Sequence, residues 1–566
     1  MKTCISGVIA LTLLFLGNVA QAQYHDPRAL EADPVNATQA LAPKLDGVGE
    51  HTLPVSTANP ESQYFFNQGL RLTYAFNHSE ALRSFKEAAR LDPENAMAWW
   101  GQALVLGPNI NLPMMPYVLE QTWQALQRAV ALRDKVTDKE RGLIDALAMR
   151  YAATPDDRQA ERNRAWADAM LVLADLYPDD PDIATLTSSA IMNLSPWDYW
   201  HNDGTPYART TRVLEMLGQA TQNFPQHTGA LHYYIHITEA QRPDLGEAAA
   251  ELLSGITPGA GHLLHMPSHI YMRLGRYADT YAVNKAASAA DEAYIAASNA
   301  QGLYAMGYYP HNVHFMVWSA QSMGRYGDAM TAARQIEAKI PEFIGDIGVE
   351  SPTGRYADAW QLFEIFLAQP MYTMARFGDW QAVLNEPQPP AAAQFMTGVW
   401  HYARGLAYVH TDNRRKAGKE LRRLEKLIAS DTLAEYPASL NGARILLTIA
   451  AGVLEGEIEA AAGDYDDAIT ALSEAVRLQD SLLYMEPPDW FMPSRHYLGA
   501  VLLDAGRARE AETVYWADLR KNPNNGYALF GVAQAQAAQD KDNSAVLARF
   551  KNAWANADRE LSSSRF

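Results

Sequence analysis

"NQGLRLTYAFNHSEALRSFKEAARLDPENAMAWWGQAL", residues 67–104, is the stretch that decides the fold. Its apolar residues recur at helical spacing, small residues stand at Gly69, Ala81 and Ala88, and Pro93 interrupts the pattern. Strand signals are weak along the whole chain, because no sustained alternation of apolar and polar residues is flanked by hairpin turns. The sequence therefore predicts an all-α protein.

The same pattern recurs along the chain. Residues 495–536 repeat it with Gly499, Gly506, Ala511 and Pro523, and residues 454–478 repeat it with Gly456, Gly463, Ala468 and Ala475. Two Gly-Arg-Tyr triplets, at 275–277 and 324–326, mark two further units. Weaker units begin near residues 183, 228 and 400. Such internal repetition predicts an array of similar supersecondary units.

These residues fall at fixed places of a 34-residue tetratricopeptide pattern: in the opening stretch Gly69, Ala81, Phe85, Ala88 and Pro93 take the eighth, twentieth, twenty-fourth, twenty-seventh and thirty-second places. The chain resembles the tetratricopeptide repeat (TPR) superfamily, and in particular an exported bacterial TPR-domain protein. The resemblance implies antiparallel helix pairs stacked into a solenoid, a right-handed superhelix with a concave groove.

Five regions are predicted. Residues 1–22 resemble a cleavable signal peptide, with Lys2 before an apolar run that ends in the small-x-small pattern Ala20-Gln21-Ala22. Residues 23–60 are predicted to form an extended arm, and residues 61–384 a TPR-like solenoid with a histidine-rich groove. The proline-rich stretch 385–393 is predicted to be a linker before the TPR-like repeats of residues 394–566.

The composition of the chain limits the kinds of partner and metal ligand that are expected. The leader predicts export, to the periplasm of a bacterium, and no later apolar run reaches the roughly 18–20 residues that span a bilayer. The one cysteine, Cys4, lies in the leader, so any metal in the mature chain must bind His, Asp, Glu, Met or backbone oxygen. A formal net charge of −18 repels polyphosphate, so nucleic acid is not an expected partner.

Histidines are concentrated in the middle of the chain. Seven of the fifteen lie between residues 232 and 314, namely His232, His236, His262, His265, His269, His311 and His314. Counted from each unit's own start, they fall at the second, fifth and ninth places of three successive first helices. The TPR resemblance implies that these places line the concave groove. The seven imidazoles are therefore predicted to share one space.

A transition-metal site is the favoured interpretation of this cluster. Imidazole nitrogens bind copper, zinc and iron, and two histidines one helical turn apart can chelate one ion. Glu239 stands three residues after His236 and is a candidate carboxylate ligand or base. Two alternatives stay open: a structural hydrogen-bond network with the neighbouring tyrosines, or direct contact with a peptide, including a pH-sensitive contact. Pro267 weakens the register, since a helix beginning there leaves His262 and His265 in the preceding turn.

Two functions follow. The leading one is an exported TPR solenoid with a multi-histidine metal site, for metal handling or for oxidoreductase or hydrolase chemistry on a small substrate, with Glu239 and His496 as candidate catalytic residues. The alternative is a periplasmic scaffold that binds a protein or peptide in the same groove without metal. Residues 195–207, rich in aromatic side chains, are expected to pack between repeats rather than to form a pocket wall. No cofactor-binding motif for a nucleotide is present in the sequence.

Overall fold

The computed structural model describes residues 25–566, except 155, 202, 347–362, 391, 435, 437 and 491. The predicted leader, residues 1–22, lies outside the described residues. Helices joined by turns make up the described part of the chain, with two isolated β-bridges and no strand. The all-α prediction is therefore confirmed. Within the same residues, no helix has both the length and the apolar character needed to cross a bilayer.

The chain forms two compact units, which are described separately. The N-terminal unit contains the described residues 25–270 and 286–309, and the C-terminal unit contains 271–285 and 310–566 without the gaps given above. The chain passes from one unit to the other within α14 (Pro267–Arg273), α15 (Tyr277–Ser298) and the start of α16 (Tyr309–Ser322).

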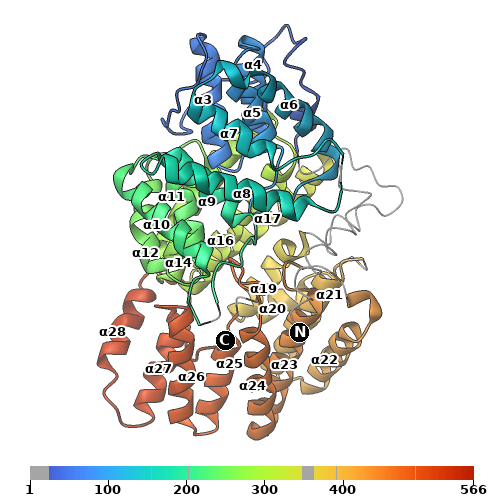
Figure 1. Ribbon diagram of the computed structural model, residues 1–566. Helices are drawn as coiled ribbons and strands as arrows, with labels where there is room; N and C mark the ends of the chain where they lie inside the picture. The colour runs from blue at the N-terminus through green and yellow to red at the C-terminus, as the bar shows by residue number, and fades with distance from the viewer. Residues whose placement is uncertain are drawn as a thin grey trace. The chain divides into compact units, whose positions relative to one another are not determined.

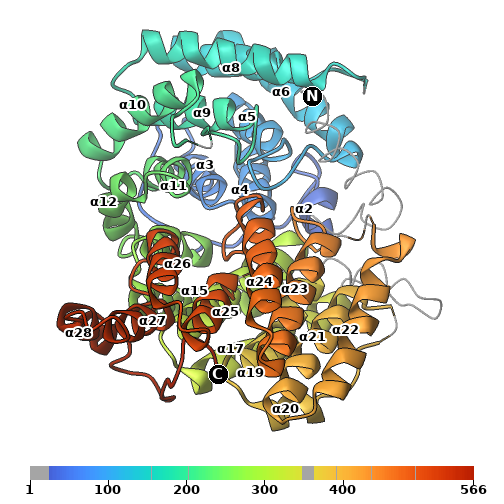
Figure 2. The same cartoon turned by 90° about the horizontal axis from the view of Figure 1, so that it is seen from below.

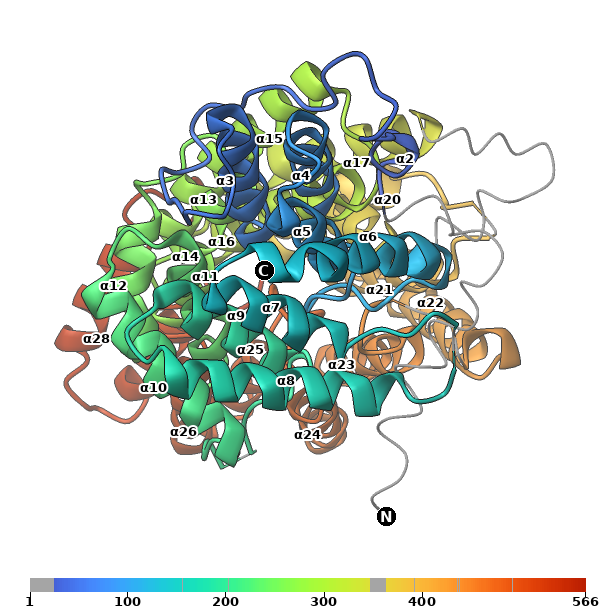
Figure 3. The ribbon, with the colours of Figure 1, turned by 45° about the horizontal axis from the view of Figure 1, so that its top comes forward.

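Successive helices of the N-terminal unit pack as neighbouring pairs (Figures 2 and 3). From α3 to α12 each helix contacts the next, and α3 also contacts α5, α5 contacts α7 and α9 contacts α11, as stacked helix hairpins do. The helices are α2 (Pro27–Glu31), α3 (Pro60–Tyr74), α4 (His78–Leu91), α5 (Ala96–Val105), α6 (Leu119–Leu132), α7 (Asp138–Ala148), α8 (Gln159–Leu176), α9 (Pro181–Met192), α10 (Ala208–Asn223), α11 (Thr228–Thr238), α12 (Pro243–Leu253) and α13 (Gly261–His265), with short turns η1 (Pro116–Val118), η2 (Arg133–Lys135) and η3 (Tyr304–Tyr308).

The C-terminal unit repeats this arrangement, and α25 to α28 lie side by side in Figure 1. The predicted linker, residues 385–393, joins α20 to α21 inside this unit. Its remaining helices are α17 (Tyr326–Asp346), α19 (Gln369–Arg376), α20 (Trp380–Asn385), α21 (Gln394–His410), α22 (Arg414–Ile428), η4 (Asp431–Leu433), α23 (Ala443–Ala462), α24 (Tyr465–Asp480), α25 (Ser494–Asp504), α26 (Ala508–Lys521), α27 (Gly526–Ala537) and α28 (Ser544–Ala553).

Small residues let the hairpins stack closely. In the N-terminal unit the ring of Phe85 on α4 lies between α3 and α5, where a Cβ on Gly69 would stand 2.7 Å from it and a Cβ on Gly101 2.5 Å. In the C-terminal unit Tyr515 on α26 lies in the same way between Gly499 and Gly531. A bulky residue on a second helix between glycines on two first helices is the packing unit that the repeat pattern predicts. The chain is thus a TPR-like helical-hairpin solenoid within each unit, whereas the right-handed superhelix and its groove stay predictions.

The N-terminal arm is fixed along α3 and α4. It contains the short helix α2, whose last carbonyls receive the ammonium of Lys86: Nζ donates to the oxygens of Ala29, Leu30 and Ala32 at 2.7, 3.0 and 2.8 Å. Burial lowers the pKa of Lys86 to about 8. A cation at the C-terminal end of a helix also interacts favourably with the helix dipole. The arm is therefore an integral part of the N-terminal unit.

Two helices far apart in sequence meet in this unit. The end of α3 contacts the start of α11, where a Cβ on Gly229 would stand 2.6 Å from the ring of Tyr74 (Figure 2). Only a residue without a side chain allows this close approach. The contact brings the turn after α3 against the histidine-bearing face of α11.

Candidate metal centre

His232 and His236 lie one turn apart on one face of α11, as their spacing predicts. Both are buried, with exposed fractions of 0% and 2%. His262 on α13 is also buried, with 2% of its surface exposed. One ring nitrogen of each of these three histidines lies within 4.8 Å of a ring nitrogen of the other two. Three of the seven predicted ligands are therefore brought together within the N-terminal unit.

The hydrogen bonds of His232 and His236 fix which nitrogen of each ring carries the proton. His232 Nδ1 lies 2.6 Å from the carbonyl oxygen of Tyr74, so it must donate and carries the proton. His236 Nδ1 lies 3.3 Å from Glu239 Oε1, a carboxylate oxygen, and donates in the same way. The Nε2 atoms of both rings are buried and have no hydrogen-bond partner among the described residues. Each ring therefore keeps an uncommitted lone pair on a buried Nε2, the usual arrangement of a metal-ligating histidine.

His262 is held by the C-terminal part of the same unit. Its backbone N–H donates to the hydroxyl of Tyr304 at 3.3 Å, and that hydroxyl donates to Asp291 at 2.8 Å. Of the kink or helix start expected at Pro267, the structure has a helix start, because α13 ends at His265 and α14 begins at Pro267. His262 still reaches the centre, since α13 packs it beside His232 with ring centroids 5.0 Å apart.

Glu239 links the centre to two further predicted ligands. Its Oε2 lies 2.7 Å from His269 Nδ1, and His269 Nε2 lies 2.7 Å from His265 Nε2. The hydroxyl of Ser268 lies 3.3 Å from the other nitrogen of His265. Glu239 itself is fully buried. His236, Glu239 and His269 are also close enough together to hold an ion, so Glu239 can act either as a ligand or as the partner that orients His236.

Burial keeps the two α11 imidazoles neutral. The pKa of His232 is well below its ordinary value, mainly because of burial and secondly because of the neighbouring His236. Burial, followed by His269, likewise lowers the pKa of His236. A neutral imidazole has a lone pair to give, so no proton has to be displaced before a metal ion binds.

Two aromatic residues that the sequence prediction missed close the centre. The ring of Phe76 lies 4.5 Å from that of His232, 5.8 Å from His236 and 5.5 Å from His262, and the ring of Trp197 stands edge-on to His236 at 5.3 Å. Both have left-handed backbones, with φ of 55° for Phe76 and 66° for Trp197. Bulky residues adopt this conformation only at an energetic cost, and such residues concentrate at functional sites.

A signal for Phe76 was present in the sequence. It takes the fifteenth place of its unit, where Gly275 and Gly324 stand in the two Gly-Arg-Tyr units, with φ of 73° and 74°. Glycine adopts this backbone without strain. A phenylalanine at this place therefore distinguishes the unit from the two Gly-Arg-Tyr units.

The remaining predicted site residues lie in the C-terminal unit. His314 is buried, its ring stands edge-on to Phe366, and burial lowers its pKa to about 3. His311 is half-buried with its ring against Phe315. His496 accepts a hydrogen bond at Nδ1 from Arg376 at 2.8 Å, and its Nε2 lies 2.9 Å from Asp518. Their proposed roles as ligands or catalyst stay predictions.

A second histidine group, His51, Asp182 and His227, is better explained as a hydrogen-bond network. His227 Nδ1 accepts from the backbone N–H of Ala230 at 3.0 Å and so caps α11, which leaves the proton on Nε2. That Nε2 donates to Asp182 Oδ1 at 3.2 Å. A ring whose two nitrogens are both engaged has no lone pair for a metal.

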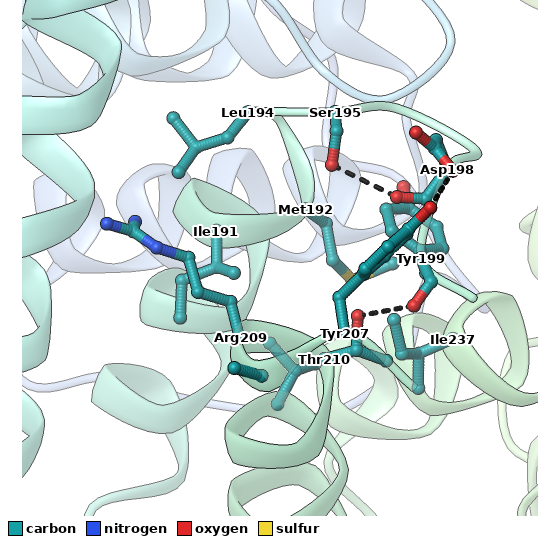
Figure 4. Close-up of a pocket in the computed structure, with 12 residues that line it drawn as sticks. Ile191, Met192, Leu194, Ser195, Asp198, Tyr199, Tyr207, Arg209, Thr210 and Ile237 are labelled. Atoms are coloured by element: carbon teal, nitrogen blue, oxygen red, sulfur yellow. Dashed lines mark hydrogen bonds between the residues drawn. The ribbon is translucent and has the colours of Figure 1, made fainter. Parts of the chain in front are cut away.

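A pocket of about 360 Å³ lies in the N-terminal unit, between the end of α9 and the start of α10 (Figure 4). Ile191, Met192, Val213 and Ile237 supply apolar walls, and Tyr199 and Tyr207 line it as well. The expectation that residues 195–207 only pack between repeats is thus incomplete. The indole N–H groups of Trp197 and Trp200 do donate to the carbonyls of Ile110 and Ile237, whereas the two tyrosines form pocket wall.

These features define a class: a TPR-like helical-repeat protein with a buried histidine cluster. No protein-family model matches the chain, and no curated protein matches it. Solved structures that align with it include the human IFIT1 dimer with m7Gppp-AAAA (13% identity, 89% of this chain and 92% of that chain, TM-score 0.27) and yeast Tom70 (11%, 85% and 90%, 0.26). The TPR domain of P58(IPK) aligns at 12% identity over 85% of this chain and 98% of that chain, with a TM-score of 0.21. TM-scores this low add nothing to what the helix pairs themselves show.

Proposed function

We propose that this chain is a metal-binding helical-repeat protein whose N-terminal unit holds one transition-metal ion between His232, His236 and His262. The observation that carries the proposal is the pair of buried Nε2 atoms on α11 without a hydrogen-bond partner among the described residues. Burying a polar nitrogen without a partner costs about 1–3 kcal/mol, and an ion bound by both atoms would remove that cost at each of them.

The donor set fits a transition metal. Nitrogen–metal distances of about 2.0 Å allow two ligands of one ion to lie at most about 4 Å apart, so binding would draw the rings together by up to about an ångström. Tyr74 and Glu239 already orient His232 and His236 by accepting a hydrogen bond from Nδ1 of each ring, as the partners of metal-ligating histidines do. Glu239 is thereby a positioning residue for His236.

The second candidate is a scaffold that binds a protein or peptide. The helical-hairpin architecture favours it, because stacked hairpins present long surfaces to partners. The leader-like residues 1–22 support export for either candidate. An exported metal-binding protein could use the ion for transport or for chemistry on a small substrate.

Metal content separates the two candidates. Mature protein, purified without an affinity tag, is expected to carry near-stoichiometric transition metal after incubation with the ion and gel filtration. His232→Asn and His236→Asn are the informative variants, because the Asn amide can replace the Nδ1–H donor of each histidine while the Nε2 ligand is lost.

His201→Ala serves as the matched control, since His201 is exposed and its ring contacts only Tyr207 among the described aromatic rings. The proposal expects metal to be lost in the two Asn variants and retained in the control, with wild-type circular dichroism in all of them. Metal-free wild-type protein, or metal that survives both Asn substitutions, would favour the scaffold instead.

A further inference from the structure

Residues 562–566, Ser-Ser-Ser-Arg-Phe, lie across the first helices of three successive hairpins in the C-terminal unit, and the end of the chain is marked near α25 in Figure 1. Side chains hold this segment in place, because among the described residues its backbone makes no hydrogen bond to another backbone group. Its partners on the three helices, here called the segment-binding surface, are Glu457 on α23, His496 and Asp504 on α25, and Tyr527 and Gln534 on α27.

A buried carboxylate on this surface pairs with Arg565. Glu457 is 2% exposed, and its ion-pair partners among the described residues are Arg565 and His410. Burial lowers the pKa of His410 to about 4, so His410 is neutral at pH 7 and the guanidinium alone compensates the charge of Glu457. Asp504 accepts a second hydrogen bond from that guanidinium at 2.7 Å. An uncompensated buried charge is strongly unfavourable, so this part of the surface requires a cation.

Ser564 occupies a position that fits a hydroxyl group. It is fully buried, and its Oγ donates to the carbonyl oxygen of His496 at 2.7 Å. The hydroxyl of Tyr515 lies 2.7 Å from the same Oγ and must therefore donate to it. Tyr515 reaches the segment from α26 because its ring lies between Gly499 and Gly531, where the first helices approach closely. A carbonyl that needs a donor and a phenol that needs an acceptor are both satisfied by one hydroxyl.

The ring of Phe566 lies in an aromatic position beside a glycine. Its centroid is 5.9 Å from that of Phe377 and 6.1 Å from that of Tyr527. A Cβ on Gly378 would stand 2.7 Å from the Cβ of Phe566, so only glycine leaves room for this residue. Three consecutive side chains thus have three chemically different partners on one folded unit.

We propose that the segment-binding surface is a peptide-binding site that residues 562–566 occupy as an internal ligand. Its partner is a segment of another protein with a hydroxyl, a guanidinium and an aromatic ring in the same order. Two carboxylates and a formal net charge of −18 for the chain favour such a basic partner. The partner has to displace the internal segment, so its apparent affinity falls in proportion to the fraction of chains in which the surface is free. The inference goes beyond the proposed function, because it concerns the C-terminal unit and requires no metal.

A fluorescent peptide copy of residues 560–566 is the probe. Fluorescence anisotropy measures its binding to the wild type, to Arg565→Ala and to Arg559→Ala. Arg565→Ala weakens the internal segment but leaves both carboxylates in place. Arg559→Ala is the matched control, because the guanidinium of Arg559 lies over the ring of Tyr326 at 4.5 Å and contacts none of the segment-binding surface. A second peptide, with Arg565→Glu, tests the charge requirement.

Arg565→Ala should bind the copy at least tenfold more tightly than the wild type and Arg559→Ala do, and the Arg565→Glu peptide should not bind. The same affinity for Arg565→Ala and the wild type, or no binding to a folded Arg565→Ala, would overturn the proposal. A concentration-dependent dimer of the wild type that Arg565→Ala abolishes in analytical ultracentrifugation would also overturn it, because the segment would then belong on a second copy of the chain.

Thiol labelling tests the same displacement without Arg565→Ala. Cys4 is the only cysteine of the chain, so Ser564→Cys in a Cys4→Ser background places a single thiol at a fully buried position. The copy peptide should raise the labelling rate in proportion to its concentration, because bound peptide keeps the displaced segment off the surface. The Arg565→Glu peptide should leave the rate unchanged. A labelling rate that neither peptide alters would refute the proposal, whatever the metal content of the protein.

Discussion

Asp182 on α9 holds together three segments that position the histidine centre, so Asp182→Asn is an informative perturbation. Its Oδ1 accepts hydrogen bonds from the hydroxyl of Tyr74 at 2.8 Å, from His51 Nε2 at 2.9 Å and from His227 Nε2 at 3.2 Å. Tyr74 is the last residue of α3, and its carbonyl oxygen orients His232. His227 caps α11, the helix that contains His232. Loss of this carboxylate should therefore reduce both stability and metal affinity.

The size of the effect follows from the charge that is lost. Asn fills nearly the same volume and still accepts hydrogen bonds, but bonds to a charged acceptor are worth about 1.5–3 kcal/mol each and neutral ones about 0.5–1.5 kcal/mol. Three weakened bonds at a buried position give an expected loss of about 3–5 kcal/mol in the free energy of unfolding, the same range as breaking a buried ion pair.

The loss should depend on pH. Burial by itself would raise the pKa of Asp182, but the hydrogen bonds from His227 and His51 outweigh it and hold the pKa well below its ordinary value. A depressed carboxyl pKa stabilises the fold above the unfolded pKa of about 3.9, and this contribution disappears as the pH falls towards the folded pKa. The difference between wild type and Asp182→Asn should accordingly shrink below about pH 4.

Urea denaturation followed by circular dichroism and tryptophan fluorescence measures the free energy of unfolding and its dependence on pH. Asp175→Asn is the control, because Asp175 pairs with Arg212 on the exposed surface, at 2.9 Å with 73% of its side chain accessible. The control should change the free energy of unfolding by less than about 1 kcal/mol. If Asp182→Asn behaves like the control at pH 7, the network does not support the centre and the reasoning is refuted.

Three further outcomes are expected. Phe85→Ala should cost about 3–5 kcal/mol in unfolding experiments, because Gly69 and Gly101 on its two sides cannot fill the cavity; a loss under about 1 kcal/mol would contradict the stacking described. Lys86→Met should release the N-terminal arm, seen as faster limited proteolysis within residues 33–58, and equal cleavage rates would disprove that anchor. Burial raises the pKa of Glu364 to about 7, so the wild-type free energy of unfolding should fall as the pH rises from about 4.5 to 7, and urea midpoints of Glu364→Gln should lack this slope.

The features of the fold that depend on residues close together in the chain could be predicted from the sequence. Gly69 and Phe85 stand at the places where hairpins must pack closely, and the i, i+4 spacing of His232 and His236 puts both on one helix face whatever surrounds them. Pro267 likewise marks a helix start that the structure has. Such features depend on near neighbours along the chain, which a single sequence displays.

Contacts between distant segments could not be read in this way. The carbonyl of Tyr74 that orients His232 lies 158 residues away in sequence, and Trp197 reaches His236 from a loop after α9. The tautomers follow from these partners and not from the histidine spacing. Phe76 was accessible in principle, because it departs from the glycine of the two Gly-Arg-Tyr units, but only the left-handed backbone and the adjacent rings show what the departure does.

The central claim is that three imidazoles bind one ion in the N-terminal unit. Crystals of tag-free protein loaded with copper, measured at the copper absorption edge, would locate that ion by its anomalous scattering. One strong peak is expected at about 2.0 Å from Nε2 of His232 and of His236 and from a ring nitrogen of His262. A peak elsewhere, or no peak with the three rings placed as described, would contradict it.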